Sequence, residues 1–379
     1  MNTEEPLQLL GGLTPATFMR RHWHKKPLLI RQAIPGFAPL LERSELLDLA
    51  AQDGVESRLV VQPSADGKRP WRFKHGPFGR KALPAFKQPG WTLLVQGVDL
   101  LDARVHALMN QFRFVPDARL DDLMISYATD GGGVGPHFDS YDVFLLQAHG
   151  RRRWRIGRQK DLRLQPDMPL KILAHFEPEQ EFVLEPGDML YLPPRYAHDG
   201  IAEGECMTYS IGFRTPRRSE LASELLQRLA EDVLDDAGAD TLYRDPGQGA
   251  VAHSADIPTA LVDFAHAAVS DALRDPLALQ RVLGAYLSEP KGHVLFDGGQ
   301  GVQLDGAVVL DRRTRMLYDT DHVFINGESF VAGGRDAQLM RRLADARSLG
   351  SADVRRLSVA ARALVMDWCE AGWMHVEHG

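Results

Sequence analysis

The chain has 379 residues, of which 44% are hydrophobic and 25% charged, so it is long enough for about two or three folded domains and is not a disordered protein. Its two cysteines exclude a disulfide framework and a cysteine-rich zinc site, no run of about 18 apolar residues predicts a membrane span, and the N-terminus lacks a secretory pattern, so we expect a cytoplasmic protein. The formal net charge of −7 argues against direct nucleic-acid binding.

Short alternating apolar runs bounded by glycine and proline predict a mainly β domain over residues 1–213. One predicted strand, Leu123–Ala128, runs into the glycine-rich stretch 131–135 and then into His137 and Asp139. Because residues two apart in an extended chain point the same way, these two side chains can aim at one point. The glycine stretch could instead be a phosphate loop, but neither a helical pattern nor Gly-Lys-Ser/Thr follows it.

A third metal ligand is expected from a strand that is distant in sequence. The predicted turn 185–188 and strand Met189–Leu192 end at two prolines, and His198 follows them. Two histidines and one carboxylate leave open positions on Fe(II), as non-heme oxygenases require. His175 competes for this place, but it precedes a polar, loop-like stretch, so we favour His198. A His-x-Asp pair alone occurs by chance in many sequences.

Another predicted strand carries a candidate cosubstrate residue. The apolar run 143–147 is followed by a predicted turn at 148–150 and a strand at 151–156. Alternation places Arg152 on the inward face with Trp154, where an unpaired charge is costly and needs an anion. The dicarboxylate 2-oxoglutarate supplies one, and an internal Asp or Glu is the alternative. The other face, which we expect to be solvated, carries Arg151, Arg153 and Arg155.

The predicted strand 206–213 has one apolar face and one face of small or hydroxylated residues. Thr208 and Ser210 lie on the second face. Such a face is useful around a bound cosubstrate, although ordinary strand packing explains it almost as well. Both residues are therefore candidate cosubstrate contacts.

The C-terminal part of the chain changes from period two to helical spacing. Apolar residues recur every four positions from Ser219 to Leu287, which predicts a helical region over residues 214–292. Over residues 293–379, an Asn-Gly pair between apolar runs predicts a hairpin at 322–331. Two helices follow, the second one capped by Ser351 and continuing to Trp368. This order predicts a winged-helix-like module.

Taken together, these motifs resemble the JmjC-type 2-oxoglutarate oxygenases, and more narrowly the bacterial ribosomal oxygenases. The resemblance covers nearly the whole chain, including the N-terminal stretch from Phe18 to Ile30. The matching stretches are Asp121–Ser126, Gly131–His137, Tyr141–Phe144, Gly150–Arg155, Pro186–Pro194 with His198, and Ser210–Arg214.

The resemblance implies a double-stranded β-helix of the JmjC/cupin type, followed by an α-helical dimerisation region and a C-terminal winged-helix-like domain. It also implies a homodimer that uses Fe(II), 2-oxoglutarate and O2 to hydroxylate the β-carbon of an arginine in a large-subunit ribosomal protein. Animal relatives that hydroxylate histidine carry lysine at the position of Arg152, so arginine favours the arginyl enzymes. A histidyl hydroxylase, or a small-molecule cupin dioxygenase that does not use 2-oxoglutarate, is the alternative.

The expected site therefore has three parts. His137, Asp139 and His198 hold the metal. The cosubstrate contacts are Arg152, Met124, Ser126, Thr208 and Ser210. The substrate contacts are Tyr141 and Asp142, with the acidic loop of Glu177, Glu179 and Glu181 as a further guess. In addition, Ala128 stands where close bacterial relatives are expected to have serine, and Ser126 or Thr208 could compensate for the missing hydroxyl.

Overall fold

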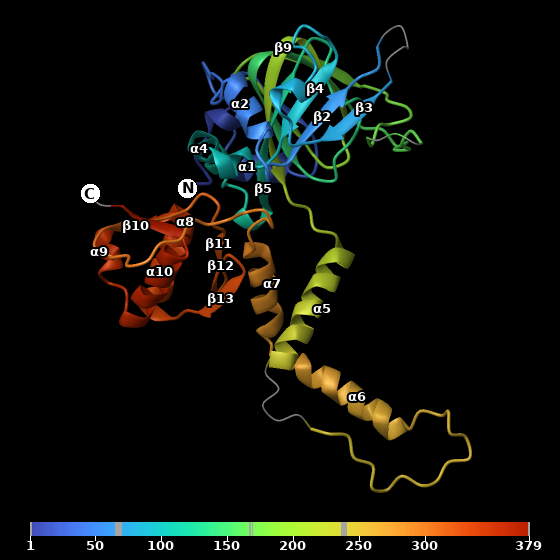
Figure 1. Cartoon of the computed structure of the whole chain (residues 1–379), viewed down its shortest axis with the longest axis vertical. Coiled ribbons are helices and arrows are strands. Elements are labelled where there is room, and N and C mark those ends of the chain that lie inside the picture. Colours follow the sequence, from blue (N-terminus) through green and yellow to red (C-terminus); the bar gives the residue numbers. More distant parts are fainter. Residues whose placement is uncertain (1, 65–69, 167, 169, 236–240, 378–379) are drawn as a thin grey trace. The chain divides into compact units, whose positions relative to one another are not determined.

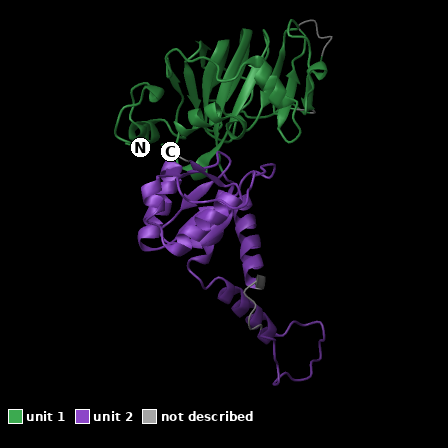
Figure 2. Cartoon of the chain, turned by 60° about the vertical axis from the view of Figure 1, so that its left-hand side comes forward, with its two compact units in different colours: residues 1–215 green, residues 216–379 purple. Residues whose placement is uncertain are grey.

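The computed structural model describes residues 2–64, 70–166, 168, 170–235 and 241–377 (Figure 1). The chain divides into two compact units, Met1–Thr215 and Pro216–Gly379 (Figure 2). The finer division into 1–213, 214–292 and 293–379 stays a prediction. In the described ranges, no helix has the length and apolar character needed to cross a membrane.

The first unit is mainly β, as the sequence predicts. Its described residues form a nine-stranded sheet in the order β1-β8-β6-β9-β5-β4-β2-β3, with β7 pairing beside β6. The strands are β1 Leu28–Ile30, β2 Ser57–Val61, β3 Arg72–His75, β4 Trp91–Val95, β5 Leu120–Ala128, β6 Val143–Gly157, β7 Gln180–Leu184, β8 Met189–Leu192 and β9 Ala197–Phe213. The helices are α1 Pro15–Arg21, α2 Arg43–Ala50, α3 Val98–Leu101 and α4 Ala103–Asn110.

The long strands β6 and β9 form the frame of this unit, because they pair with each other from Val143↔Gly212 to Gly157↔Ala197. The predicted turn at 148–150 is wrong: β6 continues through it with a β-bulge, where the register shifts and Gly150 takes a positive φ of 60°. After the bulge the predicted alternation holds. Arg152 and Trp154 are buried, whereas the side chains of Arg151 and Arg153 are 57% and 40% exposed.

The outward arginines of β6 are paired across the sheet. Arg153 forms ion pairs with Glu181 and Glu203, and Arg155 lies 2.5 Å from Asp199. The predicted solvated face is thus a ladder of ion pairs. The two pairs of Arg153 add little stability because their partners are partly exposed, whereas Asp199 is buried.

Aromatic packing joins the N-terminal segment to the sheet. The Phe18 ring of α1 lies 4.9 Å from Tyr191 of β8, and Trp23 lies 5.0 Å from Phe213 of β9. Phe18, Tyr191 and Phe213 are almost completely buried. Burial of aromatic side chains is a large favourable contribution to folding, so we expect this core to hold the sheet without a bound metal.

The second unit contains the predicted helices and hairpin. Asn326 and Gly327 both have positive φ and connect β12 to β13 in a two-residue turn, which confirms the hairpin. The helices are α5 Arg218–Asp235, α6 Thr259–Ala272, α7 Ala278–Ser288, α8 Gly334–Ala346, α9 Ser351–Val354 and α10 Val359–Glu370. The strands are β10 Ala307–Leu310, β11 Met316–Tyr318, β12 His322–Ile325, β13 Glu328–Val331, β14 Ser348–Leu349 and β15 Met374–Glu377.

The helix predicted from Ser351 to Trp368 is in fact two helices, α9 and α10. Ser351 is the first residue of α9 and does not cap it. The cap belongs to Ser358, whose hydroxyl accepts a hydrogen bond from the backbone N–H of Ala361. The Ser358 N–H in turn donates to Asp336 of α8, and this contact fixes the break between the two helices.

Candidate metal centre

Two segments that are distant in sequence bring the three expected metal ligands together. His137 and Asp139 follow β5, and His198 is the second residue of β9. A β-bridge joins the segments, with His137 N–H donating to the His198 carbonyl at 2.9 Å and His198 N–H donating back at 2.8 Å. The backbone of β9 therefore fixes the position of the loop that carries the other two side chains.

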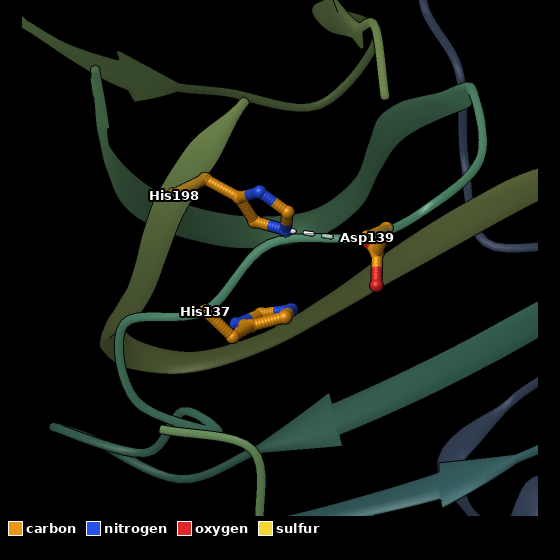
Figure 3. Close-up of side chains that lie close together, drawn as sticks. All are labelled: His137, Asp139 and His198. Carbon is orange, nitrogen blue, oxygen red and sulfur yellow. Dashed lines mark ion pairs between the residues drawn. The ribbon is translucent and has the colours of Figure 1, made fainter. Parts of the chain in front are cut away.

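The three side chains converge on one point (Figure 3). Their candidate ligand atoms all lie within 4.8 Å of one another, and His198 Nε2 lies 3.6 Å from Asp139 Oδ2. This set of two imidazoles and one carboxylate on one face is the facial triad that suits Fe(II) and leaves open coordination positions. His175, the competing ligand, is exposed and lies outside this group.

Backbone carbonyls orient both imidazole rings. His137 Nδ1 lies 2.8 Å from the Gly135 carbonyl, and His198 Nδ1 lies 2.9 Å from the Tyr196 carbonyl. Because a carbonyl only accepts, each Nδ1 carries the proton and each Nε2 keeps a lone pair for a metal. Burial, with a further contribution from neighbouring His137, lowers the pKa of His198 to about 4. The ring is thus neutral near pH 7, as a metal ligand must be.

The glycine stretch allows close packing beside the ligands and is not a phosphate loop. A Cβ on Gly133 would lie 2.4 Å from the Gly200 carbonyl, so no larger residue fits against β9 there. Gly135 has a positive φ of 80°, and a Cβ there would lie 3.1 Å from the Trp71 ring. These contacts set the path of the loop that leads into His137.

A cavity of about 350 Å³ extends from the triad into the sheet and contains Arg152. Arg152 is only 5% exposed, and its Nη1 donates to Ser126 Oγ at 3.4 Å. Its Nε and Nη2 have no hydrogen-bond partner among the described residues. Since a buried guanidinium without an anion is costly, these groups fit the carboxylate of a ligand that enters the cavity. The alternative was a salt bridge from Arg152 to an internal Asp or Glu, and no such carboxylate pairs with Arg152 among the described residues.

Comparison with known proteins connects this geometry to a family. Residues 107–221 match the JmjC domain and residues 271–375 match the ROXA-like winged helix. The ribosomal protein uL16 3-hydroxylase of Escherichia coli (strain K12) is 38% identical over 277 residues, which cover 72% of this chain and 71% of the relative. This chain belongs to the ribosomal oxygenase family of JmjC-domain proteins.

Solved structures agree with this assignment. The X-ray structure of E. coli YcfD has a TM-score of 0.80 at 32% identity and covers 96% of this chain and 98% of its own. A structure of YcfD, a ribosomal oxygenase, in complex with cobalt and 2-oxoglutarate has a TM-score of 0.77 at 32% identity, covering 97% and 99%. The predicted JmjC/cupin-type β domain, helical region and C-terminal winged helix are confirmed.

Most of the expected cosubstrate contacts of this ribosomal oxygenase line the cavity. Met124 and Ser126 of β5 and Ser210 of β9 do so. Thr208 does not line it; the Thr208 hydroxyl donates to Gln147 Oε1 at 3.0 Å. Ala128 lies in a buried apolar cluster with Ala202 and Cys206. The Ser126 hydroxyl, the first of the two expected to compensate for Ala128, accepts from Arg152.

The expected substrate contacts separate in the structure. Tyr141 is 39% exposed and lines the cavity. Asp142 is fully buried and does not line it, because its carboxylate accepts from the Tyr191 hydroxyl at 2.5 Å and lies 3.2 Å from His24 Nε2. The Asp142 side chain therefore points toward the N-terminal segment and away from the cavity, and the expectation that it contacts the substrate is wrong.

Two of the three glutamates of the acidic loop, Glu179 and Glu181, pair with residues of the chain itself. The Glu181 carboxylate pairs with Arg153, and Glu179 accepts from the Tyr196 hydroxyl at 3.2 Å. Asp121, Asp122 and Thr92 also line the cavity, although none of them was expected there. Asp122 could have been found, because alternation along β5 places it on the same face as Met124 and Ser126. Asp121 could not, because alternation places it on the opposite face, and the register shift between Leu120 and Leu123 breaks that alternation. Thr92 gave no signal, since its strand β4 has no polar pattern.

Asp142 is expected to be a stability residue, because it joins the metal-ligand loop to the N-terminal segment. Asp142→Ala leaves the buried Tyr191 hydroxyl without its acceptor, and we expect the free energy of unfolding to fall by about 3 kcal/mol. Urea unfolding measures this change. Glu177→Ala, at an exposed position, is the control and should change stability by less than about 0.5 kcal/mol. Equal stability of Asp142→Ala and the parent chain would contradict this role.

Proposed function

We propose that this chain is an Fe(II)- and 2-oxoglutarate-dependent oxygenase that hydroxylates the β-carbon of an arginine in a large-subunit ribosomal protein. The observation that carries the proposal is the presence of an open His-Asp-His triad and an unpaired, buried Arg152 in one cavity. The similarity to the uL16 3-hydroxylase of E. coli supports the class of substrate.

The roles of the cavity residues follow from their chemistry. His137, Asp139 and His198 hold the iron, since their free donor atoms converge. Arg152 binds the far carboxylate of 2-oxoglutarate, because a guanidinium and a carboxylate form two parallel hydrogen bonds. Ser126 supports Arg152, and Met124 and Ser210 contact the cosubstrate from the cavity walls.

Iron and 2-oxoglutarate, when bound, supply the oxidising chemistry: O2 is consumed, 2-oxoglutarate becomes succinate and carbon dioxide, and one oxygen atom enters the substrate. The protein itself binds and orients the reactants. Apolar cavity walls such as Val143, Leu145 and Trp154 exclude water around the reacting centre. No acid–base residue is needed in this scheme.

The substrate side of the cavity has groups that suit a guanidinium. Tyr141 and Asp121 line the cavity, and the Asp121 side chain is 42% exposed. A carboxylate near the opening attracts a positively charged side chain and disfavours an acidic one. The Asp121 carboxylate lies 3.6 Å from Arg214 Nε, and it replaces Asp142 as our candidate for the substrate contact.

Succinate formation tests the proposed function. The full chain with Fe(II), 2-oxoglutarate and O2 should form succinate slowly alone and faster when large-subunit ribosomal proteins are added. A small-molecule cupin that does not use 2-oxoglutarate would form none. Succinate formation that ribosomal proteins do not change would contradict the proposed substrate class.

A homodimer is part of the proposal, because the helices of the second unit expose apolar side chains. None of the described residues of α6 is buried. Leu226 and Val269 are 61% and 62% exposed, and a second copy of the chain would cover both side chains by C2 pairing.

We also propose a cytoplasmic location, where ribosomal proteins are available, and no direct role in nucleic-acid binding. In the C-terminal domain, exposed Arg356 pairs with Asp353 at 2.9 Å.

The dimer predicts a specific change in mass. Light scattering on the full chain at micromolar concentration should give the mass of two copies, and the double variant Leu226→Glu and Val269→Glu should give that of one copy. Val331→Glu is the control, because Val331 is 86% exposed but lies on β13, outside the helical region. A monomeric parent chain, or a double variant that remains dimeric, would overturn the prediction.

A further inference from the structure

Trp154 occupies the wall of the cavity between the metal site and Arg152. On the inward face of β6 and β9, Ile156 pairs with His198, Trp154 with Gly200, and Arg152 with Ala202. Trp154 is therefore one step along the sheet from the metal ligand and one step from the guanidinium. It is 4% exposed and lines the cavity.

A glycine across the sheet makes room for the indole ring. A Cβ on Gly200 would lie 2.6 Å from a ring carbon of Trp154, so the ring lies directly against the backbone of β9. The ring centroid is 5.8 Å from that of His198, and the Arg152 guanidinium carbon is 5.8 Å from the indole ring. The indole is thus about equally far from the His198 ring and from the Arg152 guanidinium.

The indole N–H of Trp154 is buried and lacks a partner. Its Nε1 has no hydrogen-bond acceptor among the described residues, although buried indole N–H groups usually have one. Two nitrogens of Arg152, farther along the same wall, are unpaired as well. These unpaired donors belong to two residues that line one cavity, and a ligand with acceptors over the same length would pair them.

We propose that Trp154 is a cosubstrate-binding residue, whose indole N–H donates a hydrogen bond to the 2-oxoglutarate that extends from the iron site to Arg152. This inference rests on the proposed function. The dicarboxylate has only acceptor atoms at neutral pH, which suits an indole that can only donate. Because the indole does not titrate, its contribution is independent of pH, and it distinguishes acceptor-rich ligands from apolar molecules of the same size.

Trp154→Phe tests the inference, because phenylalanine keeps a flat apolar ring and removes the N–H. Calorimetric titration of the full chain, loaded with Mn(II) in place of iron, should show 2-oxoglutarate binding about tenfold weaker than in the parent chain. Mn(II) affinity should be unchanged. The thermal unfolding midpoint of the metal-free variant should fall only by the loss of ring packing, since the lost N–H has no partner among the described residues.

Trp91→Phe is the matched control. Trp91 is completely buried, but its Nε1 donates to the Ala85 carbonyl at 3.3 Å. This control loses ring packing and also a hydrogen bond, so it should lower the unfolding midpoint more than Trp154→Phe does, and it should leave 2-oxoglutarate affinity unchanged.

The outcomes separate the inference from the proposed function. If the parent chain does not bind 2-oxoglutarate, the proposed function fails, and the inference with it. If the parent binds it and Trp154→Phe binds it equally well, only the inference is overturned. A Trp154→Phe chain that is destabilised as much as Trp91→Phe would show that the N–H has a protein partner, and this result would also overturn the inference.

Discussion

Arg152→Met is expected to raise the concentration of 2-oxoglutarate needed for half-maximal binding by two to three orders of magnitude or more, while iron binding stays intact. Removal of one member of a buried charge pair typically costs about 3–5 kcal/mol, and each 1.4 kcal/mol is about tenfold in affinity. Arg152→Lys should have a smaller effect, because lysine keeps the charge but loses the two-pronged geometry. Calorimetric titration of each metal-loaded variant with 2-oxoglutarate measures the change.

Neighbouring arginines on the same strand supply the controls for Arg152. Arg151 and Arg153 lie on the outer face of β6, and both pair with Glu203. Their replacement by methionine removes partly exposed ion pairs and should leave 2-oxoglutarate affinity nearly unchanged. If Arg151→Met and Arg152→Met weakened binding equally, the assignment of Arg152 would be lost, and with it the structural reason for a 2-oxoglutarate site.

Loss of any one metal ligand is expected to abolish turnover without unfolding the protein. His137→Ala, Asp139→Ala and His198→Ala each remove one of the three converging donors, and two donors hold Fe(II) poorly. The fold should survive, because the sheet is held by its aromatic and aliphatic core. Metal content after gel filtration and succinate formation measure the loss of the site, and circular dichroism measures the survival of the fold.

His175→Ala is the control for the ligand assignment, since His175 is exposed and outside the triad. It should retain metal content and turnover. A chain in which His198→Ala remains active while His175→Ala is inactive would show that the triad is wrong.

Strand alternation explains why much of the site could be predicted from the sequence. In an extended chain the side-chain direction repeats every two residues, so Arg152 was predicted to face inward with Trp154, and both are buried. The bulge at Gly150 interrupts this two-residue alternation. It lies just before Arg151, so the alternation of side-chain directions from Arg151 onward is as predicted. A bulge three residues later would have placed Arg152 and Trp154 on opposite faces of the predicted strand.

Side-chain direction could not be predicted where the chain leaves regular structure. Asp142 is three residues beyond a metal ligand, and nothing in the sequence shows that it turns toward Tyr191 and His24, which are distant in sequence. The missing partner of the Trp154 N–H was invisible for the same reason. An unsatisfied donor is defined by what surrounds it in space, and no local pattern encodes that absence.

Helix boundaries in the second unit could not be predicted from residue type alone. Ser351 and Ser358 are both plausible caps by residue type. Only the contact between Ser358 and Asp336, which come from different helices, decides that the helix α10 begins after Ser358.

Tandem mass spectrometry of a large-subunit ribosomal protein after reaction with the full chain tests the central claim most directly. With Fe(II), 2-oxoglutarate and O2 present, the account predicts one added oxygen on an arginine side chain, at the β-carbon, and none with the Arg152→Met variant at the same 2-oxoglutarate concentration. An added oxygen on histidine instead would contradict the arginyl assignment. Unmodified ribosomal protein alongside steady succinate formation would contradict the substrate class altogether.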